Sequence, residues 1–183
     1  MIRAFLGIDL PPALRGALQL QQFLLPLPRK VEPETLHLTL VFLGDCPDLA
    51  LEAAHEGFET LHAPCFSLSL QGLGLFGKDK PRAAWAGVAP SPDLLHLQAR
   101  TETIARRAGC PVETRKFFPH ITLGRFPPPA PPDAMRLERA VAQGQGFRAD
   151  PWRVTELTLW RSHLTGKSPH YEVLARYPLD PPA

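Results

Sequence analysis

The 183-residue sequence is poor in cysteine, and the three cysteines that it has are scattered. Cys46, Cys65 and Cys110 lie far apart and form no Cys-x-x-Cys pair. A disulfide framework or a zinc knuckle would need more cysteines at closer spacing, so the sequence predicts neither. Isolated thiols are typical of a reducing compartment, and we therefore expect a cytoplasmic protein.

Long apolar runs are also missing. The first twelve residues, MIRAFLGIDLPP, contain one early arginine and a short apolar stretch that Asp9 interrupts. Neither a signal peptide nor a membrane span can be built from such a stretch. We expect a soluble protein that does not use a membrane as a partner.

A strong excess of one charge is the third absence. The chain has 20 Lys and Arg residues against 18 Asp and Glu residues, which gives a formal net charge of +2. A protein that held duplex nucleic acid mainly by charge would usually carry a denser basic stripe. The slight basic excess permits a phosphate-bearing partner but does not require one.

Apolar periodicity and turn residues predict a mixture of strands and helices. The expected strands are Ile2–Leu10, Thr35–Leu43, Phe66–Leu70, Ala83–Val88, His120–Arg125, Val154–Trp160 and Tyr171–Tyr177. The expected helices are Ala13–Leu25, Asp48–Leu61 with Asp48 as its cap, a helix to Ala108 capped by Ser91 or Asp93, and Asp133–Val141, which follows an extended spacer at Pro127–Pro132. No sustained βαβ rhythm appears, so we predict an α+β fold with largely antiparallel sheets, in a single domain over residues 1–183.

One short motif occurs twice in a strand frame. His37-Leu38-Thr39-Leu40 and His120-Ile121-Thr122-Leu123 share the pattern His-x-Thr-Leu and lie far apart in the chain. Residues i and i+2 of a strand point to the same face, so each histidine shares a face with its threonine while the aliphatic residues face the core. Two such strands facing each other would form a cleft with two imidazoles and two hydroxyls.

That set of groups suits phosphoryl chemistry. Opening a cyclic phosphodiester requires a base that activates the nucleophile and an acid that protonates the departing sugar oxygen. Imidazoles with a pKa near 6.5 can do both at neutral pH. Threonine hydroxyls can donate hydrogen bonds to the non-bridging phosphate oxygens in the transition state. A solvated histidine on a polar strand face is the alternative for either motif taken alone.

A third His-x-Thr, at His163–Thr165, tests how specific the motif is. It is followed by Gly166-Lys167-Ser168-Pro169, which predicts a turn instead of a strand. We therefore predict that His163 is not catalytic. The first two copies share a following leucine residue and an alternating frame, and they lie in different halves of the chain.

At these residues the chain resembles the two-histidine (2H) phosphoesterase superfamily, in its bacterial 2′-5′ RNA ligase or RNA 2′,3′-cyclic phosphodiesterase branch. The resemblance extends over RAFLGIDLP, TLHLTLVFLGD, GLGLFG, AAWAGV, FFPHITLGR and the closing strands through ARYPL. It implies a bilobal fold with outer helices, a pseudo-twofold axis and one motif from each lobe in a central cleft.

The resemblance also implies roles for the motif residues. His37 would donate a proton to the leaving 3′ oxygen and His120 would accept one from water, while Thr39 and Thr122 would bind the phosphate. The product would be a 2′-phosphate end. If a 5′-hydroxyl replaced water, the same groups would form a 2′-5′ linkage without ATP. The partner would be RNA with a 2′,3′-cyclic phosphate end, with tRNA fragments among the candidate substrates, and we expect a monomer.

Two further residues are candidates for substrate binding. Arg125 could neutralise phosphate, but strict alternation places it on the face opposite His120, so it would need a β-bulge to reach the site. Phe5 could stack on a base, with core packing as the alternative. Five cations are candidates for an RNA path, with solvated surface charge as the alternative: Lys78, Lys80, Arg82, Arg115 and Lys116.

We expect no cofactor and no metal. Gly72–Lys78 matches the first seven positions of a phosphate-binding loop, but Asp79 stands where a hydroxyl should bind the metal and Pro81 follows where a helix should run. The His-x-Thr motifs have no neighbouring cluster of His, Asp or Glu residues that could supply three or four metal ligands. His55 and His62 lie on a predicted helix without a third ligand.

Three functions remain open from the sequence. The first is an enzyme that acts on RNA ends, and the second is a module that binds RNA ends without catalysis. The third is a phosphodiesterase of small cyclic nucleotides or of 2′-5′ oligonucleotides. Two intact motifs favour an enzyme, because arginine and lysine would serve simple binding better.

Overall fold

The computed structural model describes residues 1–164 and 168–181. Its strands are β1 (Ile2–Asp9), β2 (His37–Cys46), β3 (Phe66–Phe76), β4 (Ala83–Val88), β5 (His120–Arg125), β6 (Arg148–Val154), β7 (Glu156–His163) and β8 (His170–Pro178). Its helices are α1 (Pro12–Leu24), α2 (Asp48–Glu59), α3 (Pro92–Arg107) and α4 (Pro131–Gln143), with 3₁₀ turns at Pro33–Thr35 and Gly144–Gly146.

All eight strands form one sheet in the order β6-β3-β4-β5-β2-β1-β7-β8. Every pairing between these neighbouring strands is antiparallel. The sheet divides between β5 and β2 into two halves of four strands, and at this seam Leu38 is paired with Ile121. These features confirm the predicted α+β class.

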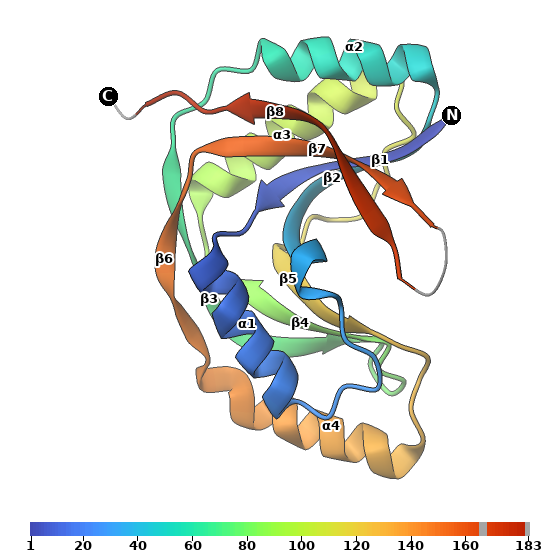
Figure 1. The fold of residues 1–183 in the computed structure, drawn as a ribbon, viewed down its shortest axis with the longest axis vertical. Helices are drawn as coiled ribbons and strands as arrows, with labels where there is room; N and C mark the ends of the chain where they lie inside the picture. The colour runs from blue at the N-terminus through green and yellow to red at the C-terminus, as the bar shows by residue number, and fades with distance from the viewer. Residues whose placement is uncertain (165–167, 182–183) are drawn as a thin grey trace.

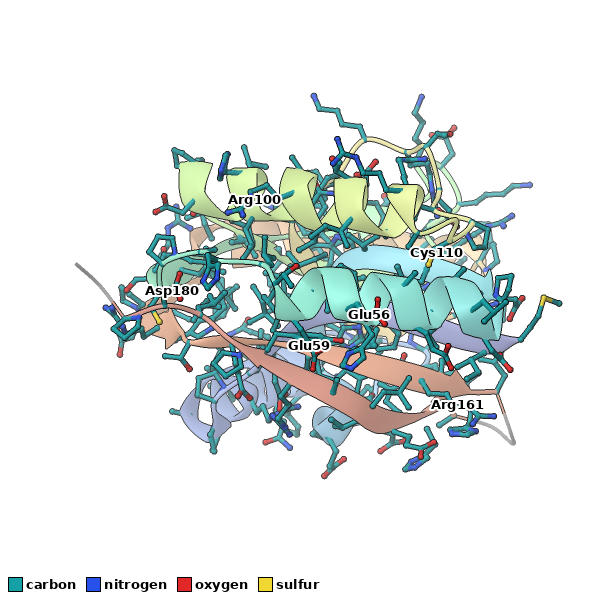
Figure 2. All side chains as sticks on the ribbon, turned by 90° about the horizontal axis from the view of Figure 1, so that it is seen from above. Glu56, Glu59, Arg100, Cys110, Arg161 and Asp180 are labelled. Carbon is teal, nitrogen blue, oxygen red and sulfur yellow. The ribbon has the colours of Figure 1, made fainter. Side chains whose placement is uncertain are left out.

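The helices cover the two halves in pairs (Figure 1). α2 and α3 lie on the half that contains β2, and α1 and α4 lie on the half that contains β5. Figure 2, seen from above, shows α2 and α3 side by side over the sheet, with Cys110 close to both. The Sγ atoms of Cys110 and Cys46 are 2.8 Å apart, which joins the end of β2 to the segment after α3.

The chain order reveals a duplicated unit that crosses between the halves. β1-α1-β2-α2 and β4-α3-β5-α4 have the same order of elements, and the separation in sequence between the starts of β2 and β5 equals that between the starts of α2 and α4. α1 follows β1 but packs against β5, while α3 follows β4 but packs against β2. Each half of the sheet is thus covered by one helix that follows a strand of the other half.

A single apolar core runs through both halves. It includes side chains of the strands on either side of the seam, among them Leu6, Leu38, Ile121 and Leu123, all fully buried. Leu38 and Ile121 follow directly after His37 and His120. Burial of these aliphatic residues on one face therefore fixes the histidines on the other face.

Several predicted elements need correction. The strand expected at Thr35–Leu43 begins only at His37, because Pro33–Thr35 form a 3₁₀ turn, and it continues to Cys46. Asp48 is the first residue of α2 instead of its cap, and Pro47 precedes it without a side-chain hydrogen bond. Ser91 is the cap of α3, and its Oγ accepts a hydrogen bond from the Leu94 amide.

The remaining differences concern proline-rich and irregular segments. Pro131 and Pro132, expected at the end of an extended spacer, form the first turn of α4, where the lack of an amide proton costs nothing. β3 extends from the predicted Phe66–Leu70 to Phe76. Arg148–Val154 was not predicted as a strand, yet it forms β6 and pairs with β3. Among the described residues, no helix is long and apolar enough to cross a membrane.

Candidate active site

The two His-x-Thr motifs lie on neighbouring strands and face each other. The pair Leu38–Ile121 fixes the antiparallel register of β2 and β5. Continued by one residue in each direction, this register places His37 opposite Thr122 and Thr39 opposite His120. All four side chains line one cavity of about 220 Å³, which we call the histidine cavity.

Both motif strands bulge at the same place. His37–Phe42 and His120–Arg125 share one burial pattern, in which two consecutive buried residues interrupt the alternation just before the last residue. The pairing with β1 skips Leu40, and the pairing with β4 skips Leu123. A β-bulge of this kind moves the following side chain to the other face. Phe42 and Arg125 thereby join the histidine face, and both line the cavity.

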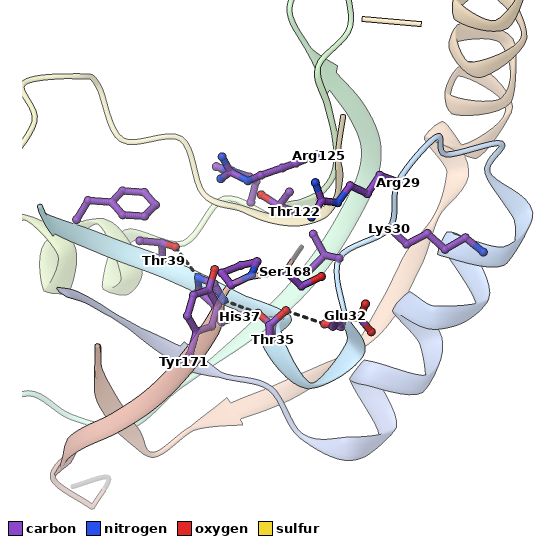
Figure 3. Close-up of a pocket in the computed structure, with 14 residues that line it drawn as sticks. Arg29, Lys30, Glu32, Thr35, His37, Thr39, Thr122, Arg125, Ser168 and Tyr171 are labelled. Carbon is purple, nitrogen blue, oxygen red and sulfur yellow. Dashed lines mark hydrogen bonds between the residues drawn. The ribbon is translucent and has the colours of Figure 1, made fainter. Parts of the chain in front are cut away.

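His37 is held by two hydrogen bonds that define its tautomer (Figure 3). Its Nδ1 lies 2.6 Å from the Thr35 carbonyl oxygen, which can only accept, so Nδ1 carries the proton of the neutral ring. Its Nε2 lies 2.9 Å from the Thr39 hydroxyl, which then donates to Nε2. The orientation leaves Nε2 on the cavity side as the atom that can gain a proton.

His120 is held in the same way. Its Nδ1 donates to the Phe118 carbonyl oxygen at 2.6 Å. In both motifs the acceptor is the carbonyl two residues before the histidine, so the local backbone orients each ring. Each neutral imidazole therefore presents an unprotonated Nε2, and the two rings can exchange protons with a group bound between them.

Aromatic rings surround each histidine. The centroid of the His37 ring is 4.7 Å from that of Phe5 and 5.3 Å from that of Tyr171, which meets it edge-on. The His120 ring lies 4.9 Å from Phe76, also edge-on, and 5.9 Å from Phe118. These rings flank the imidazoles and restrict their rotation.

Burial and charge keep both imidazoles neutral in the unliganded protein. Burial lowers the pKa of His37 from 6.5 to about 4, although the hydrogen bond to Thr35 opposes this change, and the positive charge of Arg125 adds to the lowering. Burial also lowers the pKa of His120, and Arg125 contributes in the same direction. A bound anion would reverse part of this effect, because it favours the imidazolium form.

A basic loop closes one side of the histidine cavity. Arg29 and Lys30 line it, and their loop rests on β5, where the Val31 amide donates to the Leu123 carbonyl oxygen at 2.9 Å. A Cβ atom on Gly124 would come within 2.5 Å of the Arg29 carbonyl oxygen. Glycine at position 124 is therefore what allows the loop to approach the strand.

Phe5 has a different place from the one predicted. Its side chain is 3% exposed and is packed between His37 and Trp160, whose ring centroids are 4.7 and 5.2 Å away. No face is left on which a base could stack, so the burial contradicts a base-stacking role and agrees with core packing.

Phe42, which sequence reasoning missed, has a 45% exposed side chain in the cavity. Its position five residues after His37, matching that of Arg125 after His120, was the available signal.

Some of the other predicted residues line a cavity, and others lie away from both cavities. His163 is the last residue of β7, and its Nε2 lies 2.7 Å from a carboxylate oxygen of Glu172 on β8. Thr165 and the two residues after it lie outside the described residues. Of the five cations expected along an RNA path, Arg82, Arg115 and Lys116 line a second cavity described below, whereas Lys78 and Lys80 line neither cavity.

The structure bears on two other kinds of site, a metal centre and a phosphate-binding loop. Within residues 1–164 and 168–181, no group of three His, Cys, Asp or Glu side chains is placed to hold a metal ion. Gly72–Phe76, part of the apparent phosphate-binding loop, lies within strand β3. An extended strand cannot wrap its amides around a phosphate as such a loop does.

Comparisons with known proteins all identify the same family. Residues 10–166 match the family model of the 2′-5′ RNA ligase superfamily. The chain is similar to an RNA 2′,3′-cyclic phosphodiesterase of Escherichia coli, with 32% identity over 97% of this chain and 96% of the relative. A relative of the same name in Methanothermobacter thermautotrophicus is 31% identical over 93% of this chain and 95% of the relative. A third, from Geobacillus stearothermophilus, is 34% identical over 85% of this chain, which spans only about half of that relative (49%).

Solved structures agree with this picture. The structure of E. coli LigT in complex with 3′-AMP superposes with a TM-score of 0.81 at 29% identity, and the match covers 97% of this chain and 98% of that one. A structure from Thermus thermophilus gives a TM-score of 0.77 at 28% identity, with 97% of each chain covered.

Proposed function

The chain belongs to the 2′-5′ RNA ligase superfamily, and we propose on that basis that it hydrolyses RNA 2′,3′-cyclic phosphate ends to 2′-phosphate ends. Relatives named RNA 2′,3′-cyclic phosphodiesterase that match over nearly the whole of both chains support this activity. The observation that carries the proposal is the pair of imidazoles in one cavity, each with its Nδ1 tied to a backbone carbonyl and its Nε2 able to exchange a proton.

We assign the base to His120 and the acid to His37. Nε2 of His120 removes a proton from water, whose oxygen attacks the phosphorus. The bond from phosphorus to the 3′ oxygen breaks, and Nε2 of protonated His37 donates its proton to that oxygen. The phosphate stays on the 2′ oxygen, and no electron donor or nucleotide is consumed. Each proton transfer contributes roughly 10²–10⁴-fold to the rate.

Thr39, Thr122 and Arg125 would stabilise the phosphate. In the neutral state the single hydroxyl proton of Thr39 is engaged by His37. When His37 gains a proton, its Nε2–H becomes a donor, and the Thr39 hydroxyl proton is released to turn toward a phosphate oxygen. Phosphate binding and the charging of His37 therefore favour each other. Arg125 would add a charge-assisted hydrogen bond from the facing strand.

The acid role of His37 has a consequence for pH dependence. In the free enzyme the pKa values of both histidines lie below 6.5, so the form with one proton on the pair is populated at mildly acidic pH. We expect a bell-shaped profile of kcat/KM with its maximum below pH 6.5, because kcat/KM reports the free enzyme. The profile of kcat is expected at higher pH, since the bound phosphate raises both pKa values.

Arg125→Gln tests the electrostatic part of this account. Removing the positive charge makes each imidazolium less unfavourable, so both limbs of the kcat/KM profile are expected to move to higher pH while the rate falls. Arg136→Gln, on the exposed face of α4 and outside both cavities, is the control and should leave the limbs in place. Limbs that stay fixed in Arg125→Gln would show that Arg125 does not set the pKa values.

Metal independence and product identity test the reaction itself. We expect hydrolysis of a 2′,3′-cyclic-phosphate-ended oligonucleotide to survive EDTA within twofold, without added nucleotide, and to yield a 2′-phosphate. Chromatography against authentic 2′- and 3′-phosphate standards identifies the product. Loss of activity with chelator, restored by a divalent ion, would contradict two-histidine catalysis. A 3′-phosphate as main product would mean that the acid and base are reversed.

We propose further properties of the same enzyme. Joining of RNA ends through a 2′-5′ bond without ATP follows from the reversibility of the same steps. A monomer suffices, because one chain supplies both histidines. The three free cysteines favour a reducing compartment such as the cytoplasm. tRNA fragments with cyclic phosphate ends are suitable substrates for a comparison with 2′,3′-cyclic mononucleotides, which would separate an RNA enzyme from a nucleotide phosphodiesterase.

A further inference from the structure

A second and larger cavity opens beside the histidine cavity. Its volume is about 590 Å³, and we call it the Phe118 cavity. It shares a wall with the histidine cavity, made of Thr39, Phe42, His120, Thr122 and Arg125. Among the described residues, His120 lines both cavities whereas His37 lines the first alone. The Phe118 cavity therefore lies on the His120 side of the reacting phosphate.

Three exposed aromatic rings line the Phe118 cavity. They are Phe42, Phe76 and Phe118, with exposed fractions of 45%, 38% and 48%. The rings come from β2, from β3 and from the segment before β5. Exposed aromatic faces next to a phosphate site are the surfaces on which unpaired bases stack.

Cations also line the Phe118 cavity. Arg82 and Lys116 line it and take part in no ion pair with the described residues. The two carboxylates of the lining have partners: Glu113 accepts from Arg115 at 2.8 Å, and Glu102 accepts from Arg106 at 2.9 Å. The lining therefore has positive charge that no described carboxylate neutralises, beside exposed rings, a combination that suits single-stranded nucleic acid.

The size of this cavity exceeds what hydrolysis requires. Water needs only about 30 Å³ on the side of the base. Because His120 activates the nucleophile, a large aromatic cavity on its side can hold a nucleophile much bigger than water. We propose that the Phe118 cavity binds the RNA strand that carries a 5′-hydroxyl end. This inference rests on the roles proposed for His37 and His120.

The step that this strand undergoes balances without any co-reactant. In cleavage of a 2′-5′ bond, Nε2 of His37 takes the proton of the 3′-hydroxyl, whose oxygen attacks the phosphorus. The bond from phosphorus to the 5′ oxygen breaks, and Nε2 of protonated His120 gives its proton to the 5′ oxygen. The products are a 2′,3′-cyclic phosphate and a 5′-hydroxyl strand, which leaves from the Phe118 cavity. Joining is the reverse of this step.

Two substrates separate this site from the reacting centre. A 2′-5′-linked RNA with several nucleotides on the 5′-hydroxyl side places that strand in the Phe118 cavity, whereas 2′,3′-cyclic AMP has no such strand. We expect Arg82→Ala and Lys116→Ala each to lower kcat/KM for 2′-5′ cleavage about 10-fold relative to hydrolysis of the cyclic nucleotide. Arg136→Ala, an exposed cation outside both cavities, is the matched control and should leave the ratio unchanged.

A length series gives a second measurement. In the unmodified enzyme, lengthening the 5′-hydroxyl strand from one to three nucleotides is expected to raise kcat/KM for cleavage, and Arg82→Ala with Lys116→Ala together should remove most of that gain. Equal losses on both substrates would overturn the proposal and assign the cavity to the cyclic nucleotide itself. Unchanged rates on both, with no length effect, would also overturn it. Failure of the unmodified enzyme on 2′,3′-cyclic AMP and on a cyclic-phosphate-ended RNA would refute the proposed function instead.

Discussion

His37→Ala and His120→Ala are each expected to lower kcat/KM for cyclic phosphate hydrolysis by about 10²–10⁴-fold, because each removes one of the two proton transfers. His163→Ala, which changes a histidine of the same tripeptide, should stay within twofold of the unmodified enzyme. His163 pairs with Glu172 at an exposed strand end and lines neither cavity. Initial rates on one cyclic-phosphate-ended oligonucleotide allow the three variants to be compared.

The double variant sharpens this comparison. If the two imidazoles act on one transition state, His37→Ala with His120→Ala should lose far less than the product of the single losses. Circular dichroism must show that all variants are folded. A near-normal rate in either single variant would remove that histidine from the mechanism.

Phe5→Ala is expected to lower the free energy of unfolding by about 3–5 kcal/mol, because it deletes a buried ring from the core. The same change leaves a void beside the His37 ring, which Phe5 contacts at a centroid distance of 4.7 Å. We therefore expect kcat to fall while KM changes little. Urea unfolding and steady-state kinetics measure the two effects.

Phe5→Leu is the matched variant for this test. Leucine keeps most of the apolar volume, so the loss of stability should be clearly smaller and His37 should retain its orientation. If Phe5→Ala instead raised KM for nucleotide substrates and left stability unchanged, base stacking by Phe5 would have to be reinstated.

The chemistry of the site could be read from the sequence because it depends on alternation. His37 and Thr39, like His120 and Thr122, need only a strand to share a face, and the aliphatic residues between them indicate which face is buried. The pairing of two strands so distant in the chain is a property of the tertiary structure. Its prediction depends on a resemblance and not on the local pattern.

The bulges mark the limit of local reasoning. Alternation alone places Arg125 away from the site and gives no reason to consider Phe42. Each is turned inward by two consecutive buried residues whose packing depends on the neighbouring strand. The missed strand β6 has the same origin, because it forms where β3 offers it an edge. The missed start of α4 has a local origin instead, because the first helical turn needs no amide donor and so accepts Pro131.

The fold is nearly symmetric, whereas the reaction needs two groups with different roles, an acid and a base. The asymmetry appears at the two bulges, where one strand presents the ring of Phe42 and the other presents the guanidinium of Arg125. It also appears in the pKa values. Burial lowers the pKa of both histidines, and the lowering is large for His37, whose pKa falls to about 4. Equivalent backbone positions thus supply an apolar surface in one motif and a positive charge in the other.

The crossing of α1 and α3 determines how the two repeats depend on each other. β1-α1-β2-α2 taken alone would send α1 away from its own strands, so those strands would lack the cover that α3 provides. Such a unit could complete itself only with a second copy, as a domain-swapped dimer does. In this protein the second repeat is attached to the first through the segment between α2 and β4, which contains β3. The exchange is therefore intramolecular, and assembly of the active site does not depend on protein concentration.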